Sequence, residues 1–169
     1  MREWREWTVA GALVETPAGL LLVRNLRRGG FEDWSPPGGV IDDEDASLLE
    51  GLTREVEEET GLRVLVWEGP LYEVRATAPD MGWRMRCEVY YALEFAGEVR
   101  VGDPDGIVVE AMFVPPAECP ARLTGCARWV REPLAEWLAA RWGPADARGF
   151  DYEVRGTRRE ALQVLRAAL

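Results

Sequence analysis

The sequence predicts an α/β fold, a mixed β-sheet with helices on both of its faces. Residues 83–95 alternate apolar and charged side chains with a period of two, which is typical of a half-buried strand. Residues 48–60 have the pattern of a helix, with start and stop signals at its two ends. Segments of strand and helix character alternate irregularly along the 169 residues, an order that fits a sheet covered by helices. A core of this size needs no disulfide or structural metal for stability.

Turn-forming residues divide the first part of the chain. Thr16-Pro17-Ala18-Gly19 separates two β-rich runs, residues 7–15 and 19–25, and we expect these runs to form a hairpin. Residues 27–40 collect glycines and prolines, and we expect them to form a loop.

The clearest element is the helix expected over residues 48–60. Ser47 and Glu50 stand in capping-box register at its start. Gly61 suits the left-handed turn that ends many helices.

Three strand segments are expected after this helix. Residues 64–75 form one or two strands interrupted near Gly69-Pro70, and residues 83–95 form the alternating strand. Residues 107–114 form a further strand, which follows the turn-forming run Asp103-Pro104-Asp105-Gly106.

The C-terminal part mixes helix, linker and strand signals. Residues 127–142 are helical in pattern but contain Pro133, which should break or kink that helix. Residues 143–149 have the composition of a linker and residues 150–155 that of a short strand. Residues 157–160 carry a second capping box, so we expect them to open a terminal helix.

The composition excludes several classes of function. The chain has no histidine, and all 20 basic residues are arginine because lysine is absent. These absences exclude Ser-His-Asp and Cys-His catalysis, histidine-ligated metals, lysine Schiff bases and the lysine of a P-loop. The net charge of −10 opposes binding to a nucleic acid polymer or to an anionic membrane. Carboxylate, arginine, thiol and metal-bound water remain for catalysis.

Two further features concern the compartment. The chain begins MREWREW without the apolar core of a signal peptide, and its longest aliphatic run, residues 20–23, is too short to span a bilayer. We therefore expect a cytoplasmic protein. Cys87, Cys119 and Cys126 form no C-x-x-C pair, and we expect three reduced thiols that pack as small apolar residues.

Three glutamates lie on one face of the helix expected over residues 48–60. Glu55, Glu58 and Glu59 are related as i, i+3 and i+4, so their carboxylates gather near the C-terminal end of the helix. Their mutual repulsion and the helix dipole both oppose stability at that end. A divalent cation would neutralise the cluster, and carboxylate oxygens suit Mg²⁺ or Mn²⁺ that also binds a substrate phosphate. The alternative is a solvated acidic face without a ligand.

The surrounding residues extend this pattern. The run Arg54-Glu55-Val56-Glu57-Glu58-Glu59-Thr60-Gly61-Leu62 follows a glycine loop, Trp34-Ser35-Pro36-Pro37-Gly38-Gly39. Together they resemble the signature of the Nudix hydrolase family, G-x5-E-x7-R-E-U-x-E-E-x-G-U, in which U is aliphatic. The resemblance implies a Nudix-like α/β/α sandwich with a hydrolase domain over residues 1–142. Residues 143–169 would then be a strand–helix extension, packed on the same domain or on a homodimer partner.

The first half of the signature departs from the family pattern. The expected glutamate is Asp45, and eight residues instead of seven separate it from Arg54. Ala46 consequently stands at the glutamate position, one residue is inserted, and Asp45 is not assigned as a metal ligand.

The resemblance implies a role for each matching residue. Glu58 and Glu59 would bind the metal with the Gly38 carbonyl, Glu55 would be a ligand or the base that prepares water, and Arg54 would hold a neighbouring glutamate. Catalysis would then depend on Glu55, Glu58 and Arg54 with Mg²⁺ or Mn²⁺. The implied enzyme is a Nudix-type pyrophosphohydrolase that cleaves a phosphoanhydride in a nucleoside diphosphate linked to another moiety. That substrate would be ADP-ribose-like, a nucleotide sugar or a modified nucleoside triphosphate, and the product a nucleoside monophosphate or phosphate.

Four residues are candidates for binding this small-molecule nucleotide. Arg24 would meet phosphate, Trp34 would contact the substrate beside the glycine loop, and Gly39 allows close approach of the backbone. Asp105 is the first choice among later acids that would complete the site. Ordinary core or surface roles are the alternatives for Arg24, Trp34 and Asp105.

Two other functions stay open at this point. One is a catalytically silent Nudix-like sensor that binds a nucleotide without cleaving it. The other is an interaction protein whose acidic helix is merely solvated. The complete set of Glu55, Glu58 and Glu59 favours the enzyme.

Overall fold

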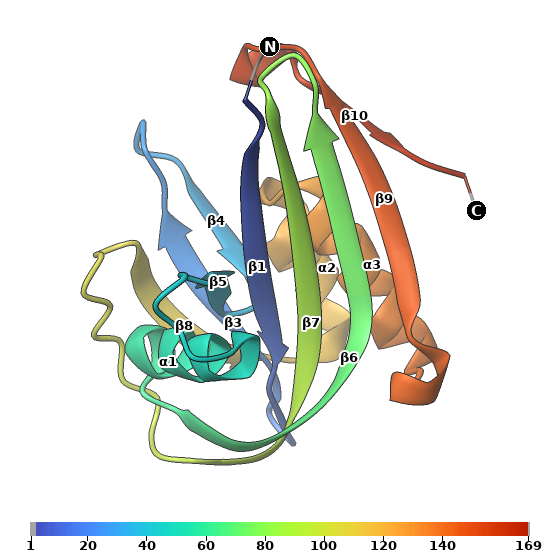
Figure 1. The fold of residues 1–169 in the computed structure, drawn as a ribbon. Helices are drawn as coiled ribbons and strands as arrows, with labels where there is room; N and C mark the ends of the chain where they lie inside the picture. The colour runs from blue at the N-terminus through green and yellow to red at the C-terminus, as the bar shows by residue number, and fades with distance from the viewer. Residues whose placement is uncertain (1–2, 169) are drawn as a thin grey trace.

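A six-stranded mixed sheet lies at the centre of the structure, a computed structural model that describes residues 3–168 (Figure 1). Its strand order is β10-β9-β6-β7-β1-β5. Neighbouring strands are parallel in the pairs β1 with β7 and β6 with β9, and antiparallel in the others. The bounds are β1 (Arg5–Leu13), β5 (Gly38–Val40), β6 (Arg63–Ala78), β7 (Trp83–Ala96), β9 (Arg148–Arg155) and β10 (Gln163–Arg166).

A second, four-stranded sheet is built around β3, which pairs with β2, β4 and β8. Its strands are β2 (Glu15–Thr16), β3 (Gly19–Leu26), β4 (Glu32–Ser35) and β8 (Val108–Val114). The predicted turn is present, because Thr16 pairs with Gly19 across it. The predicted hairpin is wrong in its first strand: β1 joins the six-stranded sheet, where β7 pairs with it along its whole length, and only β2 pairs with β3.

Helices cover both faces of the six-stranded sheet, which confirms the predicted fold class. On one face, α1 (Leu48–Thr60) buries Leu52 and Val56 against β1 and β6. On the other, α3 (Arg128–Ala140) buries Leu134 and Trp137, and the short α2 (Cys119–Arg122) precedes it (Figure 1). Within residues 3–168, no helix has the length and apolar character that a membrane crossing requires.

The predicted loop over residues 27–40 contains two strands. β4 pairs with β3, and β5 pairs with β1 through Gly38 opposite Gly11 and Gly39 opposite Ala10. A loop prediction missed β5 because two of its three residues are glycines, which contribute backbone hydrogen bonds but no strand-forming side chain.

The alternating strand is confirmed as β7, and residues 64–75 lie in the single long strand β6. The alternation fails near the end of β7, where Leu93 is 50% exposed and Ala92 is buried instead. The pairing of β6 with β7 shifts register here, because Trp67 is opposite Ala92 and Val66 is opposite Glu94, so Leu93 lies at the irregularity.

Two C-terminal predictions are wrong. The predicted break at Pro133 is wrong, because α3 continues through this residue, which is buried beside Leu134. The predicted terminal helix does not form within the described part of the C-terminus, up to residue 168: a 3₁₀ turn (Arg159–Ala161) leads into β10, which pairs antiparallel with β9. The predicted strand over residues 150–155 is confirmed as part of β9, which begins inside the predicted linker.

The three cysteines are free thiols, and Cys119 and Cys126 are buried.

Both ends of α1 are capped as predicted. The Glu50 amide donates to Ser47 Oγ at 3.1 Å, and Gly61 adopts φ 79° while its amide donates to the Glu57 carbonyl at 2.8 Å. A Cβ on Gly61 would stand 2.7 Å from the Glu98 carbonyl oxygen.

Replacing Gly61 by alanine is expected to lower the free energy of unfolding by about 1–3 kcal/mol, because the left-handed conformation and the close carbonyl both oppose a side chain. Urea unfolding measures the change. Gly102→Ala is the matched control, since a Cβ there meets open space. An equal effect of the two substitutions would contradict the explanation.

Candidate active site

The acidic face of α1 and the β5 loop enclose a pocket of 480 Å³, here called the acidic pocket. Its wall includes Asp105, one of the predicted residues, in the loop before β8. Asp103 in the same loop accepts hydrogen bonds from the amides of Asp105, Ile107 and Val108, and so shapes that wall. The pocket brings together seven of the residues singled out in the sequence: Gly38, Gly39, Arg54, Glu55, Glu58, Glu59 and Asp105.

Glu59 is the most buried of the three helix glutamates, with 7% of its surface exposed. Burial raises the pKa of its carboxyl to about 9, helped by the negative charges of Glu55 and Asp103. The Gly38 amide, which donates a hydrogen bond to Glu59 Oε2 at 3.2 Å, lowers the pKa of this carboxyl and so partly offsets the effect of burial. This carboxyl therefore holds a proton at neutral pH unless a cation replaces it.

Glu55 lies against the glycine loop, with 15% of its side chain exposed. Burial raises the pKa of Glu55, and the nearby Arg54 guanidinium partly offsets that effect. A Cβ on Gly39 would stand 3.0 Å from Glu55 Oε2. Gly39 thus leaves the space that the Glu55 carboxylate occupies.

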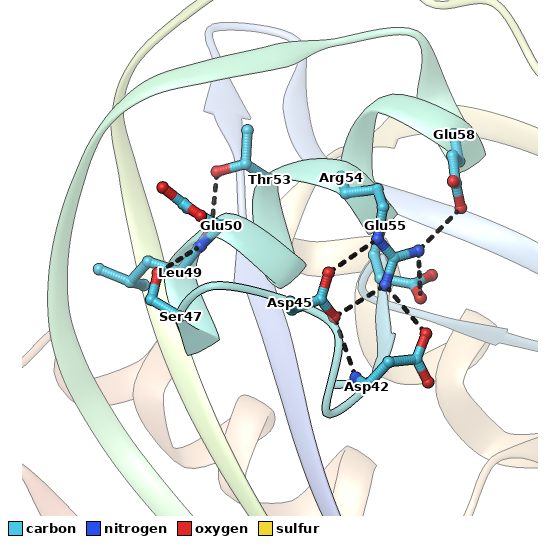
Figure 2. Close-up of polar contacts among 9 residues, drawn as sticks. All are labelled: Asp42, Asp45, Ser47, Leu49, Glu50, Thr53, Arg54, Glu55 and Glu58. Carbon is cyan, nitrogen blue, oxygen red and sulfur yellow. Dashed lines mark hydrogen bonds and ion pairs between the residues drawn. The ribbon is translucent and has the colours of Figure 1, made fainter.

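Arg54 links the glutamates to the loop before α1 (Figure 2). Its Nη1 donates to Glu55 Oε1 and to Glu58 Oε2, each at 3.3 Å. Its Nε and Nη2 donate to the two carboxylate oxygens of Asp45, each at 3.0 Å, and the guanidinium lowers the pKa of Asp45. Nη2 also lies 3.5 Å from Asp42 Oδ2. Arg54 is therefore fixed from one side and orients Glu55 and Glu58 from the other.

The irregular first half of the signature has a structural explanation. Asp45 sits in a turn in which the Asp42 amide donates to Asp45 Oδ2 at 2.9 Å, and the shorter, shifted side chain still reaches Arg54. Asp45 does not line the acidic pocket, and its carboxylate holds the Arg54 guanidinium in place through two hydrogen bonds. Gly51 makes this possible, because a Cβ there would stand 2.8 Å from Asp45 Oδ2. A glycine inside a helix was the available signal for this contact.

Two of the predicted substrate-binding residues do not line the acidic pocket. Arg24 is held by Glu32 at 2.7 Å and by Glu110 at 2.9 Å. Trp34 packs against the core on the α3 side, and the Arg122 guanidinium lies 4.9 Å from its ring centroid. Side chains alternate along β4, so Trp34 points away from the pocket that its neighbour Ser35 lines.

A second pocket, here called the apolar pocket, adjoins the first. Its volume is 320 Å³, and it lies between the six-stranded sheet and α3. Side chains of Val74, Met85, Cys87, Val89, Trp129 and Val130 form its walls. The two pockets share the residues Arg27, Ser35, Gly38, Gly39 and Val40. Sequence reasoning missed this second pocket because its lining comes from five strands and a helix that only the fold brings together.

The donor set of the acidic pocket fits a divalent cation. Among residues 3–168, no three acidic, histidine or cysteine side chains already converge as metal ligands. The burial of Glu55 and Glu59 nevertheless raises the pKa of both carboxyls, which is the electrostatic cost that a bound cation would remove. Carboxylates and a backbone carbonyl are oxygen donors of the kind that Mg²⁺ and Mn²⁺ prefer.

The acidic helix and the glycine loop lie together on a mixed sheet, which is the arrangement that the signature resemblance implies. The family model described as NUDIX domain matches residues 5–138, so the chain belongs to the Nudix family and is a pyrophosphohydrolase of that family. Nudix hydrolases act on small-molecule nucleotides and generally use divalent metal ions. No curated protein matches the chain.

Several solved structures share the fold. A MutT Nudix hydrolase from Burkholderia pseudomallei is 24% identical, with a TM-score of 0.62 over 77% of this chain and 96% of that one. A Nudix hydrolase from Nitrosomonas europaea is 23% identical, with a TM-score of 0.64 over 84% and 95%. An ADP-ribose pyrophosphatase from Streptococcus suis is 21% identical, with a TM-score of 0.54 over 85% and 98%. Identities this low establish the common fold and leave the substrate open.

Proposed function

We propose that the protein hydrolyses a phosphoanhydride bond in a nucleoside diphosphate linked to another moiety, with Mg²⁺ or Mn²⁺ as cofactor. The substrate is ADP-ribose-like, a nucleotide sugar or a modified nucleoside triphosphate, and a nucleoside monophosphate or phosphate is released. The observation that carries the proposal is the burial of two acids, Glu55 and Glu59, in one pocket next to Glu58. Burial of neighbouring carboxyl groups without a cation is costly, and the chain retains all three.

The residues of the acidic pocket have separate roles in this proposal. Glu55, Glu58 and Glu59 would hold the cation with the Gly38 carbonyl. When bound, the cation supplies charge neutralisation for the phosphoryl oxygens and acidifies a water molecule. Glu55, whose carboxyl lies against the Gly39 backbone, is placed to accept a proton from the attacking water. Arg54 acts as a positioning residue, because its donors are all taken by carboxylates.

The apolar pocket is the proposed site for the uncharged part of the substrate. Gly38 and Gly39 line both this pocket and the acidic pocket, and its other walls are aliphatic and aromatic side chains. A flat base or a similar group would bury its apolar surface there. The phosphates would then extend past the glycine loop into the acidic pocket.

The test is a product assay over four substrate classes: ADP-ribose, nucleotide sugars, oxidised nucleoside triphosphates and dinucleoside polyphosphates. The purified protein should release nucleoside monophosphate or phosphate from one class only when Mg²⁺ or Mn²⁺ is added, and excess EDTA should stop the reaction. Calorimetric binding of a nucleotide without turnover of any class would instead identify the silent sensor. Absence of both cation binding and nucleotide binding would favour the interaction protein.

Two coarser expectations accompany this proposal. We propose a cytoplasmic location. A homodimer is a further hypothesis, and size-exclusion chromatography with light scattering tests it.

A further inference from the structure

One basic side chain, Arg27, lines both the acidic pocket and the apolar pocket. It follows the end of β3 and stands where the two pockets meet at Ser35 and the glycine loop. Among residues 3–168, the other basic residue of the acidic pocket is Arg54, which is fully engaged by carboxylates. The supply of positive charge for a substrate phosphate at this junction therefore falls to Arg27.

The guanidinium of Arg27 is held on one edge only. Its Nε and Nη2 donate to Asp33 Oδ1 at 3.2 and 3.0 Å, and Nε also lies 3.1 Å from Oδ2. Asp33 is 9% exposed and accepts a further hydrogen bond from Asn25 Nδ2 at 3.0 Å, so the carboxylate that anchors Arg27 is itself fixed. Nη1 of Arg27 has no hydrogen-bond partner within residues 3–168.

We infer that Arg27 binds the phosphate group that joins the moiety in the apolar pocket to the rest of the substrate. This inference rests on the proposed function. A planar guanidinium has two usable edges, and here one edge binds a buried carboxylate while the other remains available to a phosphate oxygen. The phosphate at the pocket junction stays with the nucleoside monophosphate, so Arg27 contributes to binding substrate and product alike.

Steady-state kinetics of Arg27→Gln test the inference. A contact made equally in the ground state and the transition state changes KM and leaves kcat alone. We expect KM to rise about 10- to 100-fold, the range of a charge-assisted hydrogen bond, with kcat changed by less than about 3-fold. Arg27→Lys should rescue little, because a single ammonium cannot serve Asp33 and a phosphate together. Arg75→Gln is the matched control, since Arg75 pairs with Glu73 on the sheet surface outside both pockets.

A binding measurement separates this inference from the proposed function. AMP, GMP, CMP and UMP are titrated calorimetrically in EDTA into the wild type and into Arg27→Gln. The double variant Arg27→Gln/Asp33→Asn repeats the test without an unpaired buried carboxylate. Weaker binding in both variants supports the inference even if no substrate is turned over, an outcome that would remove the proposed function alone. Unchanged KM or unchanged monophosphate affinity, or a wild type that binds none of the four, overturns the inference.

Discussion

Replacing Glu59 by glutamine is expected to stabilise the protein at pH 8 and to abolish its metal-dependent hydrolysis. Glutamine has nearly the same shape and keeps an oxygen that can accept from the Gly38 amide, but it carries no charge to be buried. We expect the free energy of unfolding in EDTA to rise by about 2–4 kcal/mol at pH 8. Turnover should fall at least about 1,000-fold, because a ligand of the proposed cation is lost.

The stability gain of Glu59→Gln should depend on pH in a defined direction. The pKa of the Glu59 carboxyl is about 9 in the folded protein, against an ordinary value of 4.5. Below pH 4.5 the group is protonated in the folded and unfolded states, and its contribution to stability is fully present. As pH rises from 4.5 towards 9, the unfolded state loses its proton first, so wild-type stability falls by up to about 1.4 kcal/mol per pH unit. The difference between variant and wild type should therefore be small at pH 5 and large at pH 8.

Urea unfolding in EDTA at several pH values measures this difference. Glu57→Gln is the matched control, because Glu57 lies on the same helix but outside the acidic pocket. Added Mg²⁺ should raise the melting temperature of the wild type and of Glu57→Gln, and leave that of Glu59→Gln unchanged. A Glu59→Gln variant that is less stable than wild type at pH 8 in EDTA would disprove the buried-acid explanation.

Replacing Arg54 by methionine is expected to lower kcat about 100- to 1,000-fold with little change in KM. The guanidinium holds Glu55 and Glu58 through hydrogen bonds of 3.3 Å, and small misplacements of catalytic groups cost rate far more than they cost substrate binding. Because Arg54 donates to Asp45 as well, Asp45→Asn should reproduce part of the loss. Metal affinity, measured by calorimetry, should fall in both variants.

Arg84→Met controls for the general loss of an arginine–carboxylate pair, since Arg84 pairs with Glu6 on the exposed sheet face. It should leave kcat and metal affinity unchanged. An Arg54→Met variant whose KM rises while kcat stays constant would show that Arg54 contacts substrate, contrary to the positioning role.

Local signals predicted the parts of the site that depend on a single helix. The caps at Ser47 and Gly61, and the spacing of Glu55, Glu58 and Glu59, are properties of neighbouring residues, and α1 has the predicted bounds. The family signature spans this same helix and the adjacent glycine loop. Agreement there follows because few distant contacts are needed to form the element.

Features that depend on distant contacts were not predictable in the same way. Arg24 and Arg27 look equivalent in the sequence, but Glu110 of β8 holds Arg24, while Arg27 lies past the end of β3 and reaches the pocket junction. The capping box at residues 157–160 predicted a helix, and pairing of β10 with β9 overrides it. The composition of β10 carries no sign of that partner.

The edge of β6 that pairs with β9 has a practical consequence for recombinant expression. β9 is paired with β6 from Tyr72 to Thr77, and it contributes Phe150 and Tyr152 to the apolar interior. A fragment cut at residue 142, a natural choice for anyone trimming the molecule to its signature-bearing part, would leave this stretch of β6 without its neighbour. Unpaired strand edges of this kind form hydrogen bonds with other protein chains and cause aggregation. A C-terminal truncation should therefore end after Arg166, and a C-terminal affinity tag or fusion partner should be attached beyond that residue.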